Sequence, residues 1–352
     1  MGYEIDFLPV GNGESSGDAI AVRYGNLGGQ RADQTVIVID GGYSDTGKMI
    51  IDHVDRYYAT DRIDLVVSTH PDADHINGLR TVIDELDVGE LWMHLPDQHS
   101  VDLAVMKAIG WRNVGHMRGT LQKSLSAATD LEAAARARGI PITEPFSGVT
   151  HDRLVVVGPS QAFYEELLPQ FTTYTGKATL SSTMKGAIRG LVPETMFLET
   201  LSDDGETSPE NNSSTVMLLQ VDGRSLIFTG DAGMPGLDHA ADSLDGAGFD
   251  WASIKFMQIP HHGSKRNVGP SVLDRFLGHK GQVAHDKSAL ASAGPDAAPK
   301  HPHKKVLNAF TRRGCDVATT AGQSIRYGHD APDRPGWSPI EPLPLYTEVE
   351  DD

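Results

Sequence analysis

The sequence predicts an α/β protein in which two mixed β-sheets pack face to face and helices cover both outer faces. Three observations lead to this prediction. Short apolar, β-branched segments recur in both halves of the 352-residue chain. Segments with apolar residues at helical spacing separate them. Polar residues suited to chemistry follow directly after several predicted strands, which is where open α/β sheets place their sites.

The N-terminal quarter of the chain alternates between predicted strands and predicted helices. The predicted strands are residues 3–9, 18–24, 35–40 and 64–69. Helices are expected over residues 48–58 and after residue 75, because apolar side chains there recur every three or four residues. Residues 70–75 therefore form a loop that leads from a buried strand into a helix.

The remainder of the chain has a less regular pattern. Residues 97–150 are predicted to be a helical insertion, and residues 171–212, which are polar and acidic, a long loop or lid. Further strands are predicted over 154–157, 216–221, 225–229, 253–259 and 289–292, followed by a helix over 304–313. The sequence thus predicts one domain over residues 1–335 and a frayed, acidic, Pro-rich tail over 336–352.

Composition restricts the functional classes. The chain has 30 Lys and Arg against 48 Asp and Glu, a formal net charge of −18, which argues against a broad electrostatic grip on nucleic acid but not against a local basic groove. No apolar run approaches the roughly 20 residues that span a bilayer. Cys315 is the one cysteine, so there is no internal disulfide framework, and we interpret it as an inert core residue. The N-terminus lacks a signal-peptide pattern, and we expect a cytoplasmic protein.

Four potential metal ligands lie within six residues: His70, Asp72, Asp74 and His75. Imidazole and carboxylate groups together suit a divalent transition metal. The alternative is a polar turn in which Asp74 caps the following helix. A helix cap, however, does not need two histidines and two aspartates directly after a buried strand.

Two further strand ends carry residues of the same kind. Asp231 follows the strand predicted over 225–229, and His261 and His262 follow the strand over 253–259. Each strand end alone is weak evidence for a metal site, because an isolated histidine is more often a core or surface residue with its hydrogen bonds satisfied than a metal ligand. Three strand ends together predict a metal site.

At these positions the chain resembles the metallo-β-lactamase superfamily, whose fold is an αββα sandwich. The segment His-Pro-Asp-Ala-Asp-His at residues 70–75 resembles the superfamily signature His-x-His-x-Asp-His, with Asp72 in place of the second histidine. That variant is similar to the nuclease domain of the ComEC competence family, although the membrane channel of that family is absent. Segments that resemble further motifs of the ComEC domain are residues 7–11, 17–20, 211–216, 229–231, 261–265, 292–294 and 301–302.

The resemblance implies a centre with two divalent ions, Zn²⁺ or Mn²⁺. The implied metal ligands are His70, Asp72, Asp74, His75, Asp231 and His262. Asp231 would bridge the ions, and Asp74 or Asp231 would hold the proton of the attacking water. His262 is favoured over His261 as the ligand, and His261 would contact a substrate phosphate or donate a proton.

Six more residues are candidates for supporting or substrate-binding roles: Asp40, Asn212, Ser214, Ser264, Lys265 and His301. Asp40 resembles a structural aspartate of the superfamily. Asn212 and Ser214 either replace a histidine usual in the superfamily or form the ordinary polar start of a strand. Lys265 either holds a phosphate or is solvated, and His301 either reaches the site or lies in a surface loop.

The resulting hypothesis is a metal-dependent hydrolase, most simply a phosphodiesterase or nuclease whose two ions activate a water molecule. Its substrate would be DNA, RNA or a nucleotide. One alternative is a metallohydrolase of small esters, lactones or lactams, against which Asp72 and the ComEC-like motifs argue. The other is a non-catalytic member that binds a nucleotide or a partner protein, against which the complete set of ligand types argues.

Overall fold

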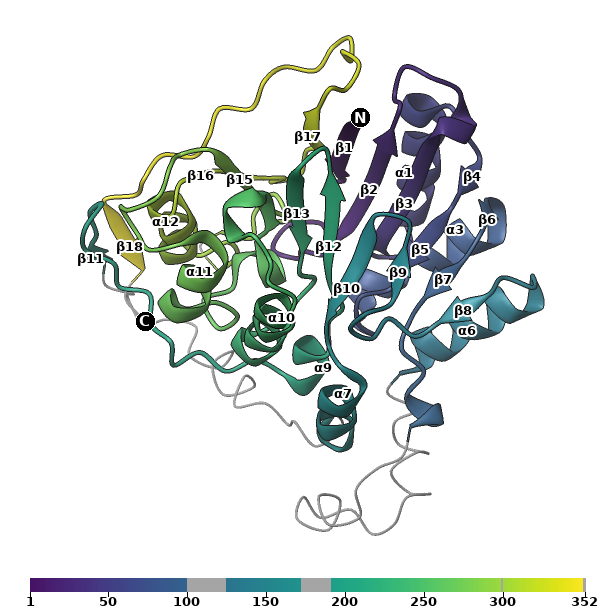
Figure 1. Cartoon of the computed structure of the whole chain (residues 1–352), viewed down its shortest axis with the longest axis horizontal. Coiled ribbons are helices and arrows are strands. Elements are labelled where there is room, and N and C mark those ends of the chain that lie inside the picture. Colours follow the sequence, from purple (N-terminus) through teal and green to yellow (C-terminus); the bar gives the residue numbers. More distant parts are fainter. Residues whose placement is uncertain (100–124, 172–190, 299, 351–352) are drawn as a thin grey trace.

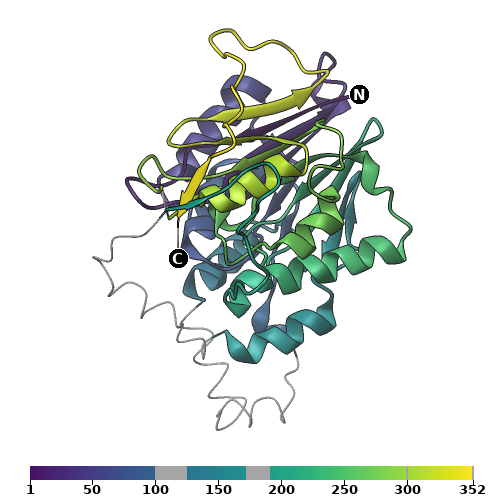
Figure 2. The same cartoon turned by 90° about the vertical axis from the view of Figure 1, so that its left-hand side faces the viewer.

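The computed structural model describes residues 1–99, 125–171, 191–298 and 300–350. Within these residues two seven-stranded sheets pack face to face, with helices on both outer faces (Figures 1 and 2). The predicted sandwich of two mixed sheets between helix layers is confirmed. None of the helices in the described part is both long enough and apolar enough to cross a membrane.

The first sheet is built from the N-terminal part of the chain and closed by one late strand. Its order is β17 (Ile325–His329), β1 (Gly2–Phe7), β2 (Ala19–Gly25), β3 (Gln34–Gly41), β5 (Leu65–Val67), β7 (Leu91–Trp92) and β8 (Ile142–Thr143). Pairing is antiparallel from β17 to β3 and parallel from β3 to β8. The helices packed on its outer face are α1 (Thr46–His53), α3 (Leu79–Glu85) and α6 (Ser126–Ala137).

The second sheet runs in the order β16 (Cys315–Thr319), β15 (Lys287–Ala291), β14 (Ile254–Gln258), β13 (Arg224–Phe228), β12 (Val216–Val221), β10 (Leu154–Gly158) and β9 (Thr150–His151). Strands β13 to β16 are parallel, whereas β9, β10 and β12 extend the sheet in antiparallel fashion. Its outer face is covered by α10 (Met234–Gly246), α11 (Pro270–Leu277) and α12 (Lys304–Arg312).

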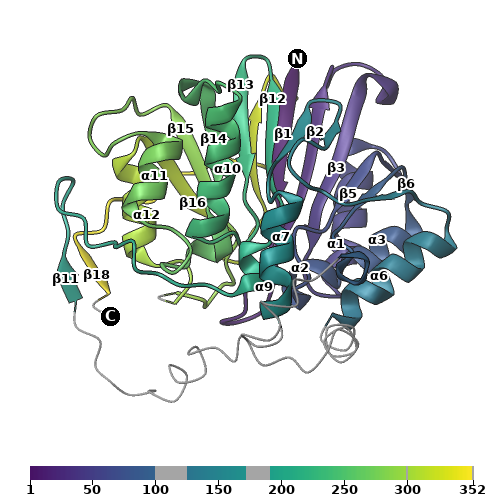
Figure 3. The same cartoon turned by 60° about the horizontal axis from the view of Figure 1, so that its bottom comes forward.

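The shorter elements connect these layers. They are α2 (Ala73–Ile76), α7 (Gln161–Leu167), α9 (Pro209–Asn212), β4 (Arg62–Ile63) paired with β6 (Asp87–Val88), and the single turns Arg31–Asp33, Val54–Tyr58, Pro96–Gln98, Leu168–Gln170, Trp251–Ser253 and Pro260–Gly263. Figure 3 shows α2 and α9 at one end of the sandwich, between its two halves.

Alternation of side chains along the strands builds two kinds of core. In β3, Val36 and Val38 contact the helices, whereas Ile37 and Ile39 lie in the core between the sheets. The inter-sheet core also contains aromatic side chains from both sheets, such as Phe228, which is fully buried. Because β3 is apolar on both faces, the prediction of a buried strand there is confirmed.

The C-terminal tail was wrongly predicted to be frayed throughout. Strand β18 (Glu348–Glu350) pairs with β11 (Leu191–Pro193) and lies beside α12 (Figure 1). Val349 is fully buried, and the Glu350 carboxylate accepts a hydrogen bond from the backbone N–H of Lys304 at 3.2 Å. Apolar burial and this cap on α12 fix the tail, and neither is visible from composition.

The predicted insertion and loop are only partly described. Residues 100–124 of the insertion over 97–150 and residues 172–190 of the loop over 171–212 lie outside the described residues. The described remainder of the insertion contains α6, and also β8, which extends the first sheet. The described remainder of the predicted long loop or lid contains two short elements, β11 and α9.

Candidate metal centre

The predicted ligands meet at one end of the sandwich, where parallel strands of both sheets end. His75 Nε2 lies 3.3 Å from Asp231 Oδ1, and His70 Nε2 lies 3.7 Å from Asp231 Oδ2. His262 Nε2 lies 3.7 Å from Asp74 Oδ2. The two oxygens of Asp231 therefore face different histidines, which is the arrangement a bridging carboxylate needs.

The candidate ligands of residues 70–75 differ in their exposure to solvent. His70 and His75 have fully buried side chains, whereas Asp72 is 44% exposed and Asp74 28% exposed. Asp72 Oδ2 lies 3.7 Å from His70 Nε2. The histidines thus form the floor of the centre, and the two aspartates lie on its open side.

Asp40 fixes the orientation of both histidines. It lies at the end of β3 with a left-handed φ of 56°, and its side chain is buried. Its Oδ2 is 2.8 Å from His75 Nδ1 and also accepts the Thr69 hydroxyl at 2.6 Å. Because the Thr69 proton goes to Asp40, the Thr69 oxygen, 3.1 Å from His70 Nδ1, must accept a proton from that nitrogen. In their neutral form both rings therefore carry the proton on Nδ1 and direct a bare Nε2 into the centre, where a second proton or a cation can bind.

The atoms that face the centre lack hydrogen-bond partners. Among the buried side-chain atoms without a hydrogen-bond partner, those that face the centre include His70 Nε2, His75 Nε2, His262 Nε2 and Asp231 Oδ1. Unpaired buried polar atoms are costly, and lone pairs of nitrogen and carboxylate oxygen repel one another at these distances. A divalent cation between them would remove both costs, so the residues present fit a metal site.

The charges within the cluster change its protonation. Burial opposes charge on His75, but the carboxylates of Asp231 and Asp40 outweigh it and hold the pKa of His75 well above the ordinary value. Burial likewise opposes charge on His262, yet Asp231, Asp74 and Asp18 raise the pKa of His262 to about 9. Burial would raise the pKa of Asp231, but His75 and neighbouring imidazoles hold it well below its usual range. Protons therefore compete with a cation for this cluster.

The turn that carries the paired histidines has an unusual backbone. His261 and His262 have φ values of 47° and 55°, and Gly263 follows with 82°. Successive left-handed residues other than glycine are costly and cluster at functional sites. The turn directs both imidazoles into the centre, because His261 Nε2 lies 3.6 Å from Asp231 Oδ2 while His262 Nε2 faces Asp74. A side chain at residue 263 would bring its Cβ to 2.4 Å from Pro302.

Of the remaining predicted residues, Ser214, Asn212 and His301 lie in the inner part of the site, and Ser264 and Lys265 in the outer part of the turn. The Ser214 hydroxyl accepts the backbone N–H of Asp231 at 3.2 Å, so Ser214 lies beside the proposed bridging residue. Asn212 is the last residue of α9 and is buried with its Oδ1 unpaired. His301 stacks on His261 with ring centroids 5.6 Å apart and therefore does reach the site. Burial and the neighbouring imidazoles lower the pKa of His301 to about 3.

Ser264 and Lys265 occupy the outer part of the turn. The Ser264 hydroxyl accepts the backbone N–H of Arg266 at 3.3 Å. Ser264 is buried, Lys265 is half-buried and Arg266 is exposed. Ser264 thus supports the turn, and the two basic residues lie towards the surface.

Several supporting residues were missed from the sequence. Asp18, at the start of β2, is buried with Oδ1 3.8 Å from His262 Nδ1, and it accepts a hydrogen bond from Gln258 at 2.7 Å. Asn267 is fully buried and contacts both His261 and Asp231. Asp18 lies within a motif already matched by resemblance, residues 17–20, which was the available signal. Asn267 had no such signal.

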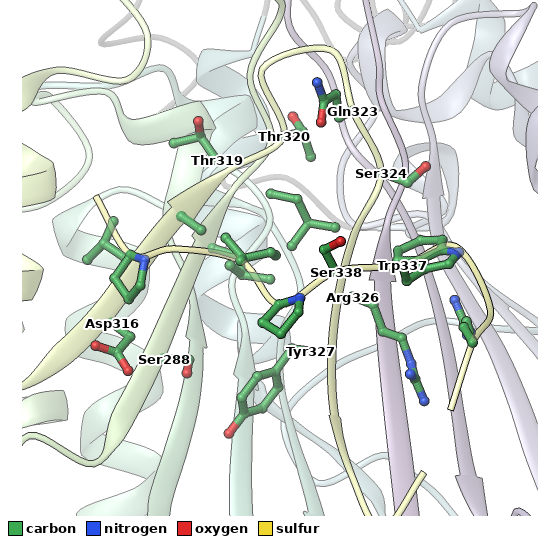
Figure 4. A pocket seen from close by; sticks show the side chains of 18 of the residues that line it. Ser288, Asp316, Thr319, Thr320, Gln323, Ser324, Arg326, Tyr327, Trp337 and Ser338 are labelled. Carbon is green, nitrogen blue, oxygen red and sulfur yellow. The ribbon is translucent and has the colours of Figure 1, made fainter. Parts of the chain in front are cut away.

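A larger cavity lies elsewhere in the molecule. It has a volume of about 950 Å³ and lies between the edge strands β16 and β17 and the segment 333–342 (Figure 4). None of the residues in the metal cluster lines it. A smaller cavity, about 130 Å³, lies beside α6 and includes His94, whose pKa burial lowers to about 3.

Comparison with known proteins agrees with this geometry. Residues 26–157 match the family model of the metallo-beta-lactamase superfamily. ComE operon protein 3 of Bacillus subtilis (strain 168) is 30% identical over 115 residues, which is 33% of this chain and 13% of that protein. The matched segment therefore spans only a small part of that relative.

The fold neighbours among solved structures are distant. A metal-dependent hydrolase of the beta-lactamase superfamily has a TM-score of 0.42 and 14% identity, covering 92% of this chain and 98% of that chain. A diphosphatase from the PhnP family has a TM-score of 0.39 and 9% identity, covering 92% and 97%. The segment 26–157, which matches the family model of the metallo-beta-lactamase superfamily, carries β3, Asp40, β5 and the candidate ligands of residues 70–75.

Proposed function

We propose that the protein is a metal-dependent phosphodiesterase that hydrolyses P–O bonds in DNA, RNA or a nucleotide. The observation that carries this proposal is the oxygen-rich ligand set around Asp231. Asp72 lies beside His70 where the superfamily signature has a histidine, and Ser214 and Asn212 lie near the position of another usual histidine. Oxygen-rich sites favour harder cations and suit the several oxygens of a phosphate group.

The ligands divide into two sets that share Asp231. His70 and Asp72 would hold one ion, and Asp74, His75 and His262 the other. Zn²⁺ or Mn²⁺ fits this mixture of imidazole and carboxylate. Bound there, two divalent ions would activate a water molecule and stabilise charge on a phosphoryl group. Three ligand carboxylates do not neutralise two such ions, so the loaded centre would attract an anion.

The chain's own residues provide orientation and access. Asp40 holds the His70 and His75 rings, the latter directly and the former through Thr69. Asp72, Asp74 and His261 are the partly exposed members, at 44%, 28% and 28%, so substrate would approach over them. Asp74 can hold the proton of an attacking water. His261 can contact the phosphate through Nε2 or, once Nε2 has taken up a proton, donate that proton to the departing oxygen.

The test is a side-by-side assay of the full chain with four substrate classes. These are bis-para-nitrophenyl phosphate, single-stranded oligonucleotides, a chromogenic lactam and a lactone, each with added Zn²⁺ or Mn²⁺ and with chelator. We expect chelator-sensitive cleavage of phosphodiesters and little lactam opening. Chelator-sensitive turnover of the lactam or lactone with every phosphodiester left intact would refute the proposal, as would metal binding without any turnover.

A further inference from the structure

The His261 ring has one nitrogen facing the centre and one facing the protein interior. Nε2 lies 3.6 Å from Asp231 Oδ2, on the substrate side. The interior nitrogen, Nδ1, lies 2.8 Å from Asn267 Oδ1 and 3.1 Å from Asn211 Nδ2. One amide oxygen and one amide nitrogen thus face the same ring atom, and only one of them can be its partner.

The orientation of the Asn267 amide is decided by the backbone. Asn267 Nδ2 lies 2.7 Å from the carbonyl oxygen of Asp231, and a carbonyl can only accept. Turning this amide over would place two acceptors 2.7 Å apart in a fully buried position. Asn267 Oδ1 must therefore face His261. Since that oxygen also only accepts, Nδ1 of His261 must carry the proton.

Asn211 does not impose an orientation of its own. Its Oδ1 lies 2.9 Å from the Ser208 hydroxyl, a group that can donate or accept. The Asn211 amide can therefore turn over, place its oxygen towards the protonated Nδ1 and keep its contact with Ser208. Of the two amides, Asn267 alone determines which nitrogen is protonated.

We propose that Asn267 is a positioning residue that holds His261 in the Nδ1–H tautomer and leaves Nε2 as the free ring nitrogen at the centre. The fold of the turn supports this role. The Ser264 N–H donates to the carbonyl of His261 at 2.9 Å, and the Asn267 N–H donates to that of Ser264 at 3.2 Å. These bonds bring Asn267 back beneath the ring, while His301 stacks at 25° to it.

The histidines of residues 70–75 are oriented in the same way. Asp40 accepts the Nδ1 proton of His75, Thr69 accepts that of His70, and Asn267 accepts that of His261. In each case an acceptor behind the ring directs a bare Nε2 towards Asp231. Asn267 differs because it is neutral and also binds the Asp231 backbone, so it couples the ring to the bridging carboxylate.

The tautomer is tested on the metal-free full chain, without reference to activity. A long-range ¹H–¹⁵N correlation spectrum at alkaline pH separates protonated from bare ring nitrogens, and His261→Gln identifies the signals of residue 261. We expect a protonated Nδ1 and a bare Nε2 in the wild type. A protonated Nε2 with a bare Nδ1 would overturn the proposal without any further variant.

Variants at residue 267 then test the cause. Asn267→Leu removes the acceptor and should give both tautomers in exchange. Asn267→Asp retains an oxygen for Nδ1 and should keep the Nδ1–H tautomer, but its second oxygen faces the Asp231 carbonyl, so this variant should be less stable than the wild type and its fold is checked by circular dichroism. Asn308→Leu is the matched control, because Asn308 is another fully buried amide, bonded instead to Glu194 and the Tyr346 carbonyl. It should leave the His261 signals unchanged. An unaltered tautomer in Asn267→Leu would contradict the proposal.

The consequence for turnover rests on the proposed function. With a phosphodiester substrate and full metal loading, Asn267→Leu should lower kcat about 10- to 100-fold with little change in KM, and Asn267→Asp should recover part of it. Unchanged kcat together with a mixed tautomer would overturn the positioning role. If the wild type cleaves no phosphodiester, the proposed function fails, while the spectrum still decides the tautomer.

Discussion

Two buried charged clusters in this protein differ in how their polar atoms are paired. In the first, Glu4 and Asp6 of β1 are fully buried and meet guanidinium groups: Arg23 lies 3.0 Å from Glu4, and Arg334 lies 2.7 Å from Glu4 and 2.6 Å from Asp6. In the metal centre, the carboxylate of Asp231 meets imidazole nitrogens, which become positively charged only by taking up a second proton. The protein supplies the positive charge in the first cluster, whereas the second needs it from outside.

The partner of a buried carboxylate indicates whether the carboxylate has a structural or a functional role. A carboxylate paired with arginine within the fold mainly affects stability when it is disturbed. Carboxylates and bare imidazoles that point at one another store unfavourable energy unless a proton or a cation binds between them, which is typical of a functional site. The two clusters should therefore respond oppositely to substitution.

The largest effect is expected at the bridging position. Asp231→Asn or His75→Ala should lower bound metal and reduce phosphodiester turnover by about 1,000-fold or more, because Asp231 would be shared by both ions and His75 would bind one of them. The fold should remain, since the core lies elsewhere. Metal analysis, circular dichroism and turnover on the same samples provide the measurement. Full metal content in Asp231→Asn would contradict the role given to this residue.

The paired cluster should show the reverse response. Arg334→Ala leaves Glu4 and Asp6 without their main partner, and breaking a buried ion pair typically costs about 3–5 kcal/mol. Denaturant unfolding should record this loss, while turnover per folded, metal-loaded molecule stays unchanged. A loss of metal in this variant, at a temperature where it is folded, would show that the clusters are not independent.

A smaller effect is expected where Asp40 orients the histidines. Asp40→Asn replaces an acceptor for His75 Nδ1 with an amide, and the change should weaken metal affinity about 10- to 100-fold. Competition with a chelating indicator dye measures that affinity. Glu85→Gln, which lies in an exposed ion pair with Lys48, is a carboxylate-to-amide control and should leave the affinity unchanged.

Dependence on pH follows from the raised pKa of His262. Asp231 and its neighbours raise the pKa of His262 from 6.5 to about 9 in the metal-free protein. Charge on this ring therefore stabilises the metal-free fold below pH 6.5, and that stabilisation is lost as pH rises through 9. Metal must displace the proton, so its affinity should increase over the same window. Isothermal titration and thermal melting across this range should show opposite slopes; parallel slopes would contradict this assignment.

The smallest effect is expected at the cysteine. Cys315 is buried in β16, and burial raises the pKa of its thiol to about 12, so it is not a nucleophile. Cys315→Ser should cost about 1 kcal/mol of stability from the buried hydroxyl and retain turnover. Abolished turnover in this variant, with metal still bound, would refute a metal-centred mechanism.

Much of the fold could be predicted because the central strands are apolar on both faces. Strands β3 and β5 have continuous apolar runs, and β13 and β14 are mostly apolar. Each of the four leads to a polar residue at the end of the sandwich where the candidate ligands lie. The two-residue strands β7 and β8 could not be predicted, because so short a segment cannot show the alternation of apolar and polar residues that indicates a strand. Helix α10 was also missed, although Leu237, Ala240, Ala241 and Leu244 recur at helical spacing.

The candidate ligands and Asp40 could be predicted to lie together, but Asp18 and Asn267, which support them, were missed. Histidines and aspartates at strand ends are distinctive in any sequence. Asp18 and Asn267, by contrast, act through tertiary contacts, such as the hydrogen bond from Gln258 to Asp18 across 240 positions of sequence. An asparagine that fixes a ring by its amide orientation has no sequence pattern, because its role depends on which acceptor lies behind it.

The central claim, that Asp231 and the bare histidines form a metal site, is tested most directly by metal stoichiometry. Elemental analysis of the full chain, as purified and after reconstitution with Zn²⁺ and Mn²⁺, should be run beside Asp231→Asn and Arg334→Ala. The account predicts about two ions per reconstituted chain in the wild type and in Arg334→Ala, and far fewer in Asp231→Asn. Less than about a tenth of an equivalent in reconstituted wild-type protein would contradict it, since unpaired buried ligands of this kind should bind metal readily.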